Sequence, residues 1–173
     1  MSKKIIITGG LGYIGTELCK LYSGVSWHHK IIIIDNRFIS ERVSQIRNWN
    51  MEFVQGDILD KDLVKKYFAD ADVVHHLAGI TDVPRTKSES LLAQDEKIKE
   101  VGEIGTQNIL DVISDKCKII FPSTHVVYEG IAEVKTNIKE DEKTKPVLSY
   151  SSSKAVNENQ LKRSGKNYII LRL

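Results

Sequence analysis

One glycine-rich stretch, Thr8-Gly9-Gly10-Leu11-Gly12-Tyr13-Ile14-Gly15, sets the architecture expected of this chain. It follows residues 3–7, a short β-branched run typical of a buried strand, and precedes residues 16–22, where apolar side chains recur at helical spacing. The glycines therefore lie in a strand-to-helix turn. One glycine allows the tight turn, a second lets a pyrophosphate approach the backbone, and a third lets helix and strand pack closely. Because a helix N-terminus also offers free amides, the stretch predicts a dinucleotide site.

A carboxylate after the second strand narrows the choice of dinucleotide. Residues 30–34 form another continuous apolar strand, which ends in Asp35, twenty positions after Gly15. A carboxylate there accepts hydrogen bonds from both ribose hydroxyls of an adenosine and repels a 2′-phosphate, so NAD is favoured over NADP. Arg37 is close enough to weaken that preference. An ordinary glycine-rich turn without a ligand would be the alternative if the glycines stood alone.

The bulk properties are those of one soluble globular domain. The 173 residues are 41% hydrophobic and 28% charged, and the formal net charge of +2 comes from interspersed signs, so nucleic acid is not expected as a partner. The apolar runs are too short for a bilayer span or a secretion signal, which predicts a cytoplasmic protein without membrane contact. Cys19 and Cys117 are expected to be reduced and structural. Since His75 and His76 would point to opposite faces of a strand, no metal site is expected.

Strand and helix patterns alternate along the chain, which predicts an α/β fold with a parallel sheet and helices on both faces. Further strands are expected at 51–55, 72–79, 118–121 and 166–173, and helices at 61–68, at 98–113 and from Ser149 onward. The polar residues 81–99, with Pro84 near their start, and residues 129–145 are expected to be loops. Ligands bind beyond the carboxyl ends of parallel strands, so Asp35, Asp57 and Ala78-Gly79 should converge on one crevice.

A tyrosine and a lysine share one face of the last expected helix. Tyr150 and Lys154 are four positions apart in Tyr150-Ser151-Ser152-Ser153-Lys154. A free tyrosine has a pKa of about 10, and a nearby ammonium group lowers it, so the phenol could exchange protons nearer neutral pH. Taken alone, such a pair is more often a solvated surface feature than a catalytic one.

Taken together, these motifs resemble the extended short-chain dehydrogenase/reductase superfamily, in its NAD-dependent nucleotide-sugar epimerase/dehydratase family. The matching segments run through the whole chain in order: residues 8–15, Asp35-Asn36, Gly56-Asp57-Ile58, His76-Leu77-Ala78-Gly79, Gly105-Thr106-Gln107-Asn108, Ser123-Thr124, and Tyr150 to Lys154. The resemblance implies a three-layer, Rossmann-like, doubly wound parallel sheet that stops after its sixth strand. Residues 1–173 would then be an NAD-binding domain, without the C-terminal substrate domain of the family, and activity is expected to need that missing part.

The resemblance also implies a role for each matching residue. Tyr150 would be the catalytic acid/base, Lys154 would lower its pKa and hold the nicotinamide ribose, and Thr124 would hydrogen-bond the reacting oxygen. The implied reaction is hydride transfer between NAD and a nucleotide-activated sugar. Asp57 and Ile58 would contact adenine. The complete set of expected cofactor contacts is Gly9, Gly12, Tyr13, Ile14, Gly15, Asp35, Asn36, Asp57, Ile58, Leu77, Ala78, Gly79, Tyr150 and Lys154.

The sequence departs from the family pattern at three places. His125-Val126 stands where the dehydratase branch has an Asp-Glu pair, so water elimination is disfavoured. Val101-Gly102-Glu103 stands where an asparagine is usual, which predicts the loss of one cofactor or water contact. Glu129 stands between Tyr128 and Gly130, whereas in the family pattern the glycine usually follows the tyrosine directly.

The expected lack of a substrate domain leaves other functions open. The last strand would be an apolar sheet edge with one poorly covered face, which predicts a homodimer or poor solubility. Two alternatives to an NAD-dependent enzyme are an NADP-linked sugar reductase, because of Arg37, and a non-catalytic dinucleotide-binding module.

Overall fold

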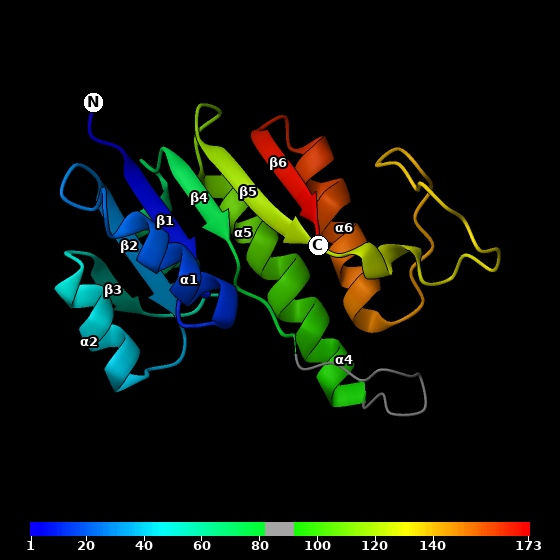
Figure 1. The fold of residues 1–173 in the computed structure, drawn as a ribbon, viewed down its shortest axis with the longest axis horizontal. Coiled ribbons are helices and arrows are strands. Elements are labelled where there is room, and N and C mark those ends of the chain that lie inside the picture. Colours follow the sequence, from blue (N-terminus) through cyan, green and yellow to red (C-terminus); the bar gives the residue numbers. More distant parts are fainter. Residues whose placement is uncertain (82–91) are drawn as a thin grey trace.

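The computed structural model describes residues 1–81 and 92–173 and contains one six-stranded parallel sheet (Figure 1). Its strands are β1 (Lys4–Thr8), β2 (Lys30–Asp35), β3 (Glu52–Gln55), β4 (Val73–His76), β5 (Lys118–Ser123) and β6 (Asn167–Arg172). They lie in the order β3-β2-β1-β4-β5-β6, and each neighbouring pair is parallel. The order reverses between β1 and β4, which is where ligands bind in doubly wound sheets.

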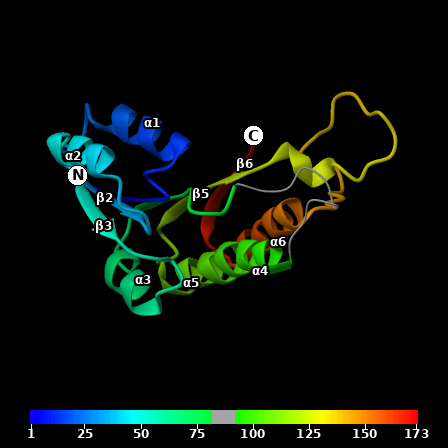
Figure 2. The ribbon, with the colours of Figure 1, turned by 90° about the horizontal axis from the view of Figure 1, so that it is seen from below.

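Helices cover both faces of the sheet, which confirms the predicted three-layer fold (Figure 2). The helices are α1 (Tyr13–Tyr22), α2 (Ser40–Asn48), α3 (Lys61–Phe68), α4 (Leu92–Lys99), α5 (Gly105–Val112) and α6 (Ser149–Arg163). Figure 2 shows α1 and α2 on one face and α3, α5 and α6 on the other. Five π-helical residues, Glu100–Ile104, join α4 to α5, and a 3₁₀ turn, His125–Tyr128, follows β5.

The isoleucine runs are continuous because the central strands are buried on both faces. Ile5, Ile7, Ile31 and Ile33 pack beneath α1 and α2, whereas Ile6, Ile32 and Ile34 belong to the core on the other face. All seven are at most 3% exposed. Full burial of such a side chain contributes about 1.5–3 kcal/mol to the stability of the fold. The apolar runs therefore stabilise the strands whose carboxyl ends form the site.

Two helices were not predicted from the sequence. α2 buries only Val43 and Ile46, so its apolar pattern is too sparse to stand out. α4 occupies much of the expected loop 81–99, and Ile98 is its only buried residue. That loop prediction is wrong for Leu92–Lys99, and Pro84 lies outside the described residues.

The outer strand β6 has an apolar, partly exposed face. Ile170 packs on the core beneath α6, whereas Ile169 and Leu171 are 39% and 44% exposed. Dimerisation through this strand stays a prediction. Across residues 1–81 and 92–173, every helix is too short or too polar to pass through a bilayer.

Candidate active site

The glycine-rich turn between β1 and α1 has the close contacts that exclude side chains. Gly9 has a φ of +65°, and a Cβ there would lie 2.8 Å from the backbone nitrogen of Ala78. A Cβ on Gly15 would lie 2.5 Å from the carbonyl oxygen of Gly9. The turn is closed by Gly12 N, which donates to Gly9 O at 3.0 Å, and by Gly9 N, which donates to Ile34 O at 2.8 Å. The turn therefore brings bare backbone to the crevice, as the sequence predicted.

The N-terminus of α1 is open to an anion. Gly12 precedes the helix, and no side chain caps it. The first-turn amides have no carbonyl partner within the helix. Tyr13 and Ile14 are 86% and 49% exposed, so the residues that carry these amides lie at the surface. Free amides, a dipole end and a cradle without Cβ atoms together fit the pyrophosphate of a dinucleotide.

Asp35 lies beside this turn and is held by it. Its carboxylate is 5% exposed, and its Oδ2 accepts a hydrogen bond from Leu11 N at 3.0 Å. Its Oδ1 accepts from the backbone N of Arg37 at 3.0 Å and from the Arg37 Nε at 3.3 Å. The guanidinium of Arg42, which the sequence analysis did not single out, donates to Leu11 O. Asp35 therefore fixes the glycine-rich turn, and Arg37 balances part of its charge.

The ends of β2 and β3 meet as the sequence predicted. Asn36 Nδ2 donates to Asp57 Oδ2 at 3.2 Å. The Ile58 side chain instead points into the core, because it is 3% exposed and packs against Gly105. The side-chain amide of Asn108 donates to Ile58 O at 3.1 Å. The predicted contact of Ile58 with adenine stays a prediction, and the buried side chain is not free to make it.

Tyr150 and Lys154 line a small cavity of about 30 Å³ at the carboxyl end of β4 and β5. Its described lining residues are Leu77, Ala78, Gly79, Ile80, Thr81, Ile98, Gly102, Phe121, Tyr150, Ser153, Lys154 and Asn157. The structure therefore brings the predicted pair next to the predicted segment 77–79. Thr124 is not among these residues. Its hydroxyl accepts from Val126 N at 3.2 Å, so its contact with a reacting oxygen stays a prediction.

Burial controls the pKa values of this pair. The Lys154 Nζ donates to Pro122 O at 2.8 Å, and it lies 4.4 Å from the ring centroid of Phe121 and 5.8 Å from that of Tyr150. Loss of solvent lowers the pKa of Lys154 from 10.5 to about 8. It raises the pKa of the Tyr150 phenol above 10.0. The predicted lowering of the Tyr150 pKa is therefore wrong for this structure, because desolvation outweighs an ammonium group that is aimed at a carbonyl.

Buried His76 links the glycine-rich turn to the helix layer beneath it. Its Nδ1 lies 3.0 Å from Thr8 Oγ1 and its Nε2 lies 2.9 Å from Thr106 Oγ1. Thr8 Oγ1 also accepts from Ala78 N at 3.0 Å, so the network supports segment 77–79. His75 points to the other face, where its Nε2 lies 2.8 Å from the Tyr22 hydroxyl. Within the described part of the chain, no three His, Cys, Asp or Glu residues are grouped to hold a metal ion.

An asparagine on α6 lies beside the segment where the family pattern has one. A Cβ on Gly102 would meet Ser153 Oγ, so a side chain there would require the Ser153 side chain to turn away. Asn157 is 2% exposed and lines the same cavity, and its Nδ2 donates to Gly102 O at 3.0 Å and to Gln160 Oε1 at 2.9 Å. Sequence spacing could not reveal this arrangement, because Gly102 and Asn157 meet only when α6 packs on the π-helical turns.

One turn after Lys154, a buried ion pair holds α6. Glu158 is 2% exposed, and its carboxylate accepts from Arg172 Nε at 2.9 Å and from Arg172 NH2 at 2.6 Å. Ser123 Oγ also donates to it, at 2.7 Å. Burial opposes the charge on Glu158, but these hydrogen bonds win and lower its pKa. The helix that carries Tyr150 and Lys154 is thereby tied to β5 and β6.

Comparison with known proteins agrees with this geometry. The model of the "NAD dependent epimerase/dehydratase family" matches residues 5–173. The chain belongs to this family. Of the segments that matched the family pattern in sequence, the glycine-rich turn and Asp35-Asn36 lie at the carboxyl ends of β1 and β2, and the Tyr150 to Lys154 segment lines the cavity at the carboxyl ends of β4 and β5.

Relatives of the chain act on nucleotide sugars, as their names state. It is 34% identical over 130 residues to UDP-N-acetyl-alpha-D-glucosaminuronate decarboxylase of Bacillus cytotoxicus, covering 74% of this chain and 38% of that protein. It is 29% identical over 183 residues to dTDP-D-glucose 4,6-dehydratase of Dictyostelium discoideum, covering 96% and 41%.

Solved structures of the family share the fold. UDP-glucuronic acid 4-epimerase from Bacillus cereus, in complex with UDP-4-deoxy-4-fluoro-glucuronic acid and NAD, superposes with a TM-score of 0.82 at 27% identity. The match covers 98% of this chain and 55% of that one. The chain thus spans about half the length of the proteins that it matches, or less.

Proposed function

We propose that residues 1–173 are the NAD-binding domain of an enzyme that oxidises and reduces a nucleotide-activated sugar. The observation that carries the proposal is the meeting, at one edge of the sheet, of an open glycine-rich turn and the partly buried pair Tyr150 and Lys154. The turn suits a pyrophosphate, and the pair suits proton transfer. A substrate-binding part is expected in addition, because the relatives are about twice as long.

The chain offers a separate group for each part of the cofactor. The amides of Tyr13, Ile14 and Gly15 would bind the pyrophosphate, and Asp35 would accept from the adenosine ribose. Two segments would flank the cofactor. After β3 these are Asp57 and the backbone of Ile58, and after β4 they are Leu77, Ala78 and Gly79. When bound, NAD supplies the hydride acceptor that no side chain can provide.

Tyr150 would act as the base in its phenolate form: its own proton would first pass to solvent, and the phenolate oxygen would then accept the proton of a sugar hydroxyl and return it in the reverse step. The phenol is protonated in the resting protein, because burial raises its pKa. Lys154 is the cation nearest its ring among the described contacts, 5.8 Å from the centroid, so its charge favours the phenolate when the proton leaves. Thr124, at the end of β5, would position the reacting oxygen.

A spectroscopic assay tests the proposal. The chain, joined to a C-terminal part that supplies the substrate-binding residues, is mixed with NAD and with UDP-glucose or dTDP-glucose, and reduced nicotinamide is followed by its near-ultraviolet absorbance. Reduction is expected, and it should be lost in Tyr150→Phe but kept in Tyr168→Phe, whose tyrosine is 38% exposed on β6. Tight NAD binding without reduction by any nucleotide sugar would contradict the proposal and favour a non-catalytic dinucleotide-binding module.

A second candidate, an NADP-linked reductase, is favoured by one contact. The Arg37 guanidinium pairs with Asp35 and remains 57% exposed, so it could also meet a 2′-phosphate. The affinities of Arg37→Ala and of the parent chain for NADP and for NAD separate the two candidates. If the protein is NADP-linked, Arg37→Ala should lose more affinity for NADP than for NAD.

A further inference from the structure

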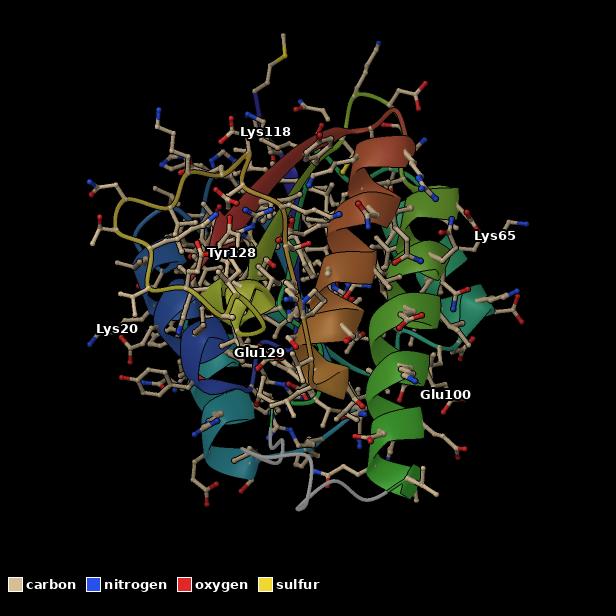
Figure 3. All side chains as sticks on the ribbon, turned by 90° about the vertical axis from the view of Figure 1, so that its right-hand side faces the viewer. Lys20, Lys65, Glu100, Lys118, Tyr128 and Glu129 are labelled. Atoms are coloured by element: carbon tan, nitrogen blue, oxygen red, sulfur yellow. The ribbon has the colours of Figure 1, made fainter. Side chains whose placement is uncertain are left out.

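The helix that carries Tyr150 and Lys154 has no cap from its own side chains. Leu148 precedes α6 and offers no polar atom to the first turn. Glu129, nineteen residues earlier, instead accepts from the backbone groups that lead into the helix and from a side chain of its first turn. Its Oε1 accepts hydrogen bonds from Val147 N and Leu148 N, both at 2.7 Å, and from the Ser151 hydroxyl. Figure 3 shows Glu129 beside the N-terminal end of α6.

This arrangement divides a capping box between two parts of the chain. In an ordinary capping box, the third helical residue is Glu or Gln, and its side chain accepts from the backbone N–H of the capping residue. The third helical residue of α6 is Ser151, which is too short for that role and instead donates to Glu129 and to Leu148 O. A carboxylate at this end also interacts favourably with the helix dipole.

Glu129 is itself fixed at the neck of the loop that follows β5. Lys145 N donates to Val127 O at 2.8 Å, and Gly130 N donates to Lys145 O at 2.9 Å. These hydrogen bonds close the loop at 131–144 directly beside Glu129. The carboxylate therefore joins the end of β5, where Thr124 lies, to the start of α6, where Tyr150 lies.

Three attachments along α6 hold it to the sheet edge. Glu129 holds the first turn, Lys154 bonds Pro122 O on the second, and Glu158 accepts from Ser123 on the third. Tyr150 lies within the first attachment, between Leu148 and Ser151. Loss of Glu129 alone leaves the other two in place, so the helix stays docked while its first turn is released.

We propose that Glu129 is a positioning residue that holds Tyr150 and Lys154 in their working geometry by capping α6 from the loop after β5. The importance of this geometry for the reaction rests on the proposed function. The cap itself is a property of the folded chain, so it can be tested without any substrate. This residue is also the point at which the sequence departs from the family pattern, with Glu129 standing before Gly130.

The test compares Glu129→Ala with Glu129→Gln, whose amide oxygen can accept the same hydrogen bonds. Ile113→Ala serves as the matched control, because it removes a 2%-exposed core side chain at the C-terminal end of α5 and lowers stability while it leaves the hydrogen bonds of Glu129 in place. The readouts are thermal unfolding, the NMR signals of the Tyr150 ring and the Lys154 ammonium group, and calorimetric titration with NAD.

The expected result is that Glu129→Ala and Ile113→Ala both lower the melting temperature, but only Glu129→Ala shifts the Tyr150 and Lys154 signals. NAD affinity should fall about tenfold in Glu129→Ala alone. Glu129→Gln should resemble the parent chain. Unchanged signals in Glu129→Ala, or a Glu129→Gln variant that behaves like Glu129→Ala, would overturn the proposal. If the parent chain binds no NAD, the proposed function fails, whereas the NMR comparison still decides the role of Glu129.

Discussion

Replacement of Lys154 by methionine should change how the stability of the protein depends on pH. Burial lowers the pKa of Lys154 from 10.5 in the unfolded chain to about 8 in the folded one. Between these values the unfolded chain binds more protons than the folded chain, so stability rises with pH. Burying the ammonium group costs about 3 kcal/mol at pH 8 and about 1 kcal/mol at pH 10, a difference of about 2 kcal/mol. Lys154→Met removes this dependence.

Urea unfolding of both proteins between pH 7 and pH 10 measures the effect. Other groups titrate in the same range, but they are shared and cancel in the difference between the two free energies of unfolding. Between pH 8 and pH 10, the free energy of unfolding of the parent chain should rise by about 2 kcal/mol relative to that of Lys154→Met. At pH 7, where the cost is largest, the variant also loses the hydrogen bond to Pro122 O, worth about 1 kcal/mol.

A constant difference between the two proteins across this range would refute the reasoning. It would mean that the ammonium group is solvated in the folded protein and that Lys154 is not held against Phe121 and Pro122. The control is Lys162→Met on the same helix, whose side chain is 47% exposed. Its difference from the parent chain should stay nearly constant with pH.

Three further predictions concern the turn, the ion pair and the buried histidine. Gly15→Ala should lower the melting temperature by several degrees and abolish NAD binding, because its Cβ would lie 2.5 Å from Gly9 O, whereas Gly24→Ala, with nothing within 4 Å, should do neither. Glu158→Gln should cost about 3 kcal/mol or more in urea unfolding, since it leaves the Arg172 charge without its partner; a loss below 1 kcal/mol would show that the pair is solvated. Burial lowers the pKa of His76 from 6.5 to about 3, so the unfolded chain alone binds this proton between those values, and stability should decrease as the pH is lowered through this range. His76→Gln should flatten this acid limb, and an unchanged limb would show that other groups cause it.

Much of the fold could be predicted because local patterns determined it. The isoleucine runs indicated strands buried on both faces, and the glycine-rich turn between a strand and a helix located the crevice. α2 was missed because only two of its side chains are buried. α4 was taken for a loop because its surface is polar and charged, and its stability comes from its continuation into α5 rather than from its own apolar face.

The candidate site was predictable in its residues but not in its energetics. Tyr150 and Lys154 do share a cavity, but the direction of the Tyr150 pKa depends on how much solvent is lost, which no sequence pattern reports. The cap from Glu129 and the pair of Glu158 with Arg172 join segments 14 to 22 residues apart, so they exist only once β5, α6 and β6 have packed.

Calorimetric titration of the chain with NAD and then with NADP tests the central claim most directly. The glycine-rich turn and Asp35 together predict saturable NAD binding, with NADP at least about tenfold weaker because its 2′-phosphate would approach a buried carboxylate. Equal or tighter binding of NADP would show that Arg37 rather than Asp35 governs the site. Absence of binding to both would contradict the proposal that residues 1–173 form a dinucleotide-binding domain.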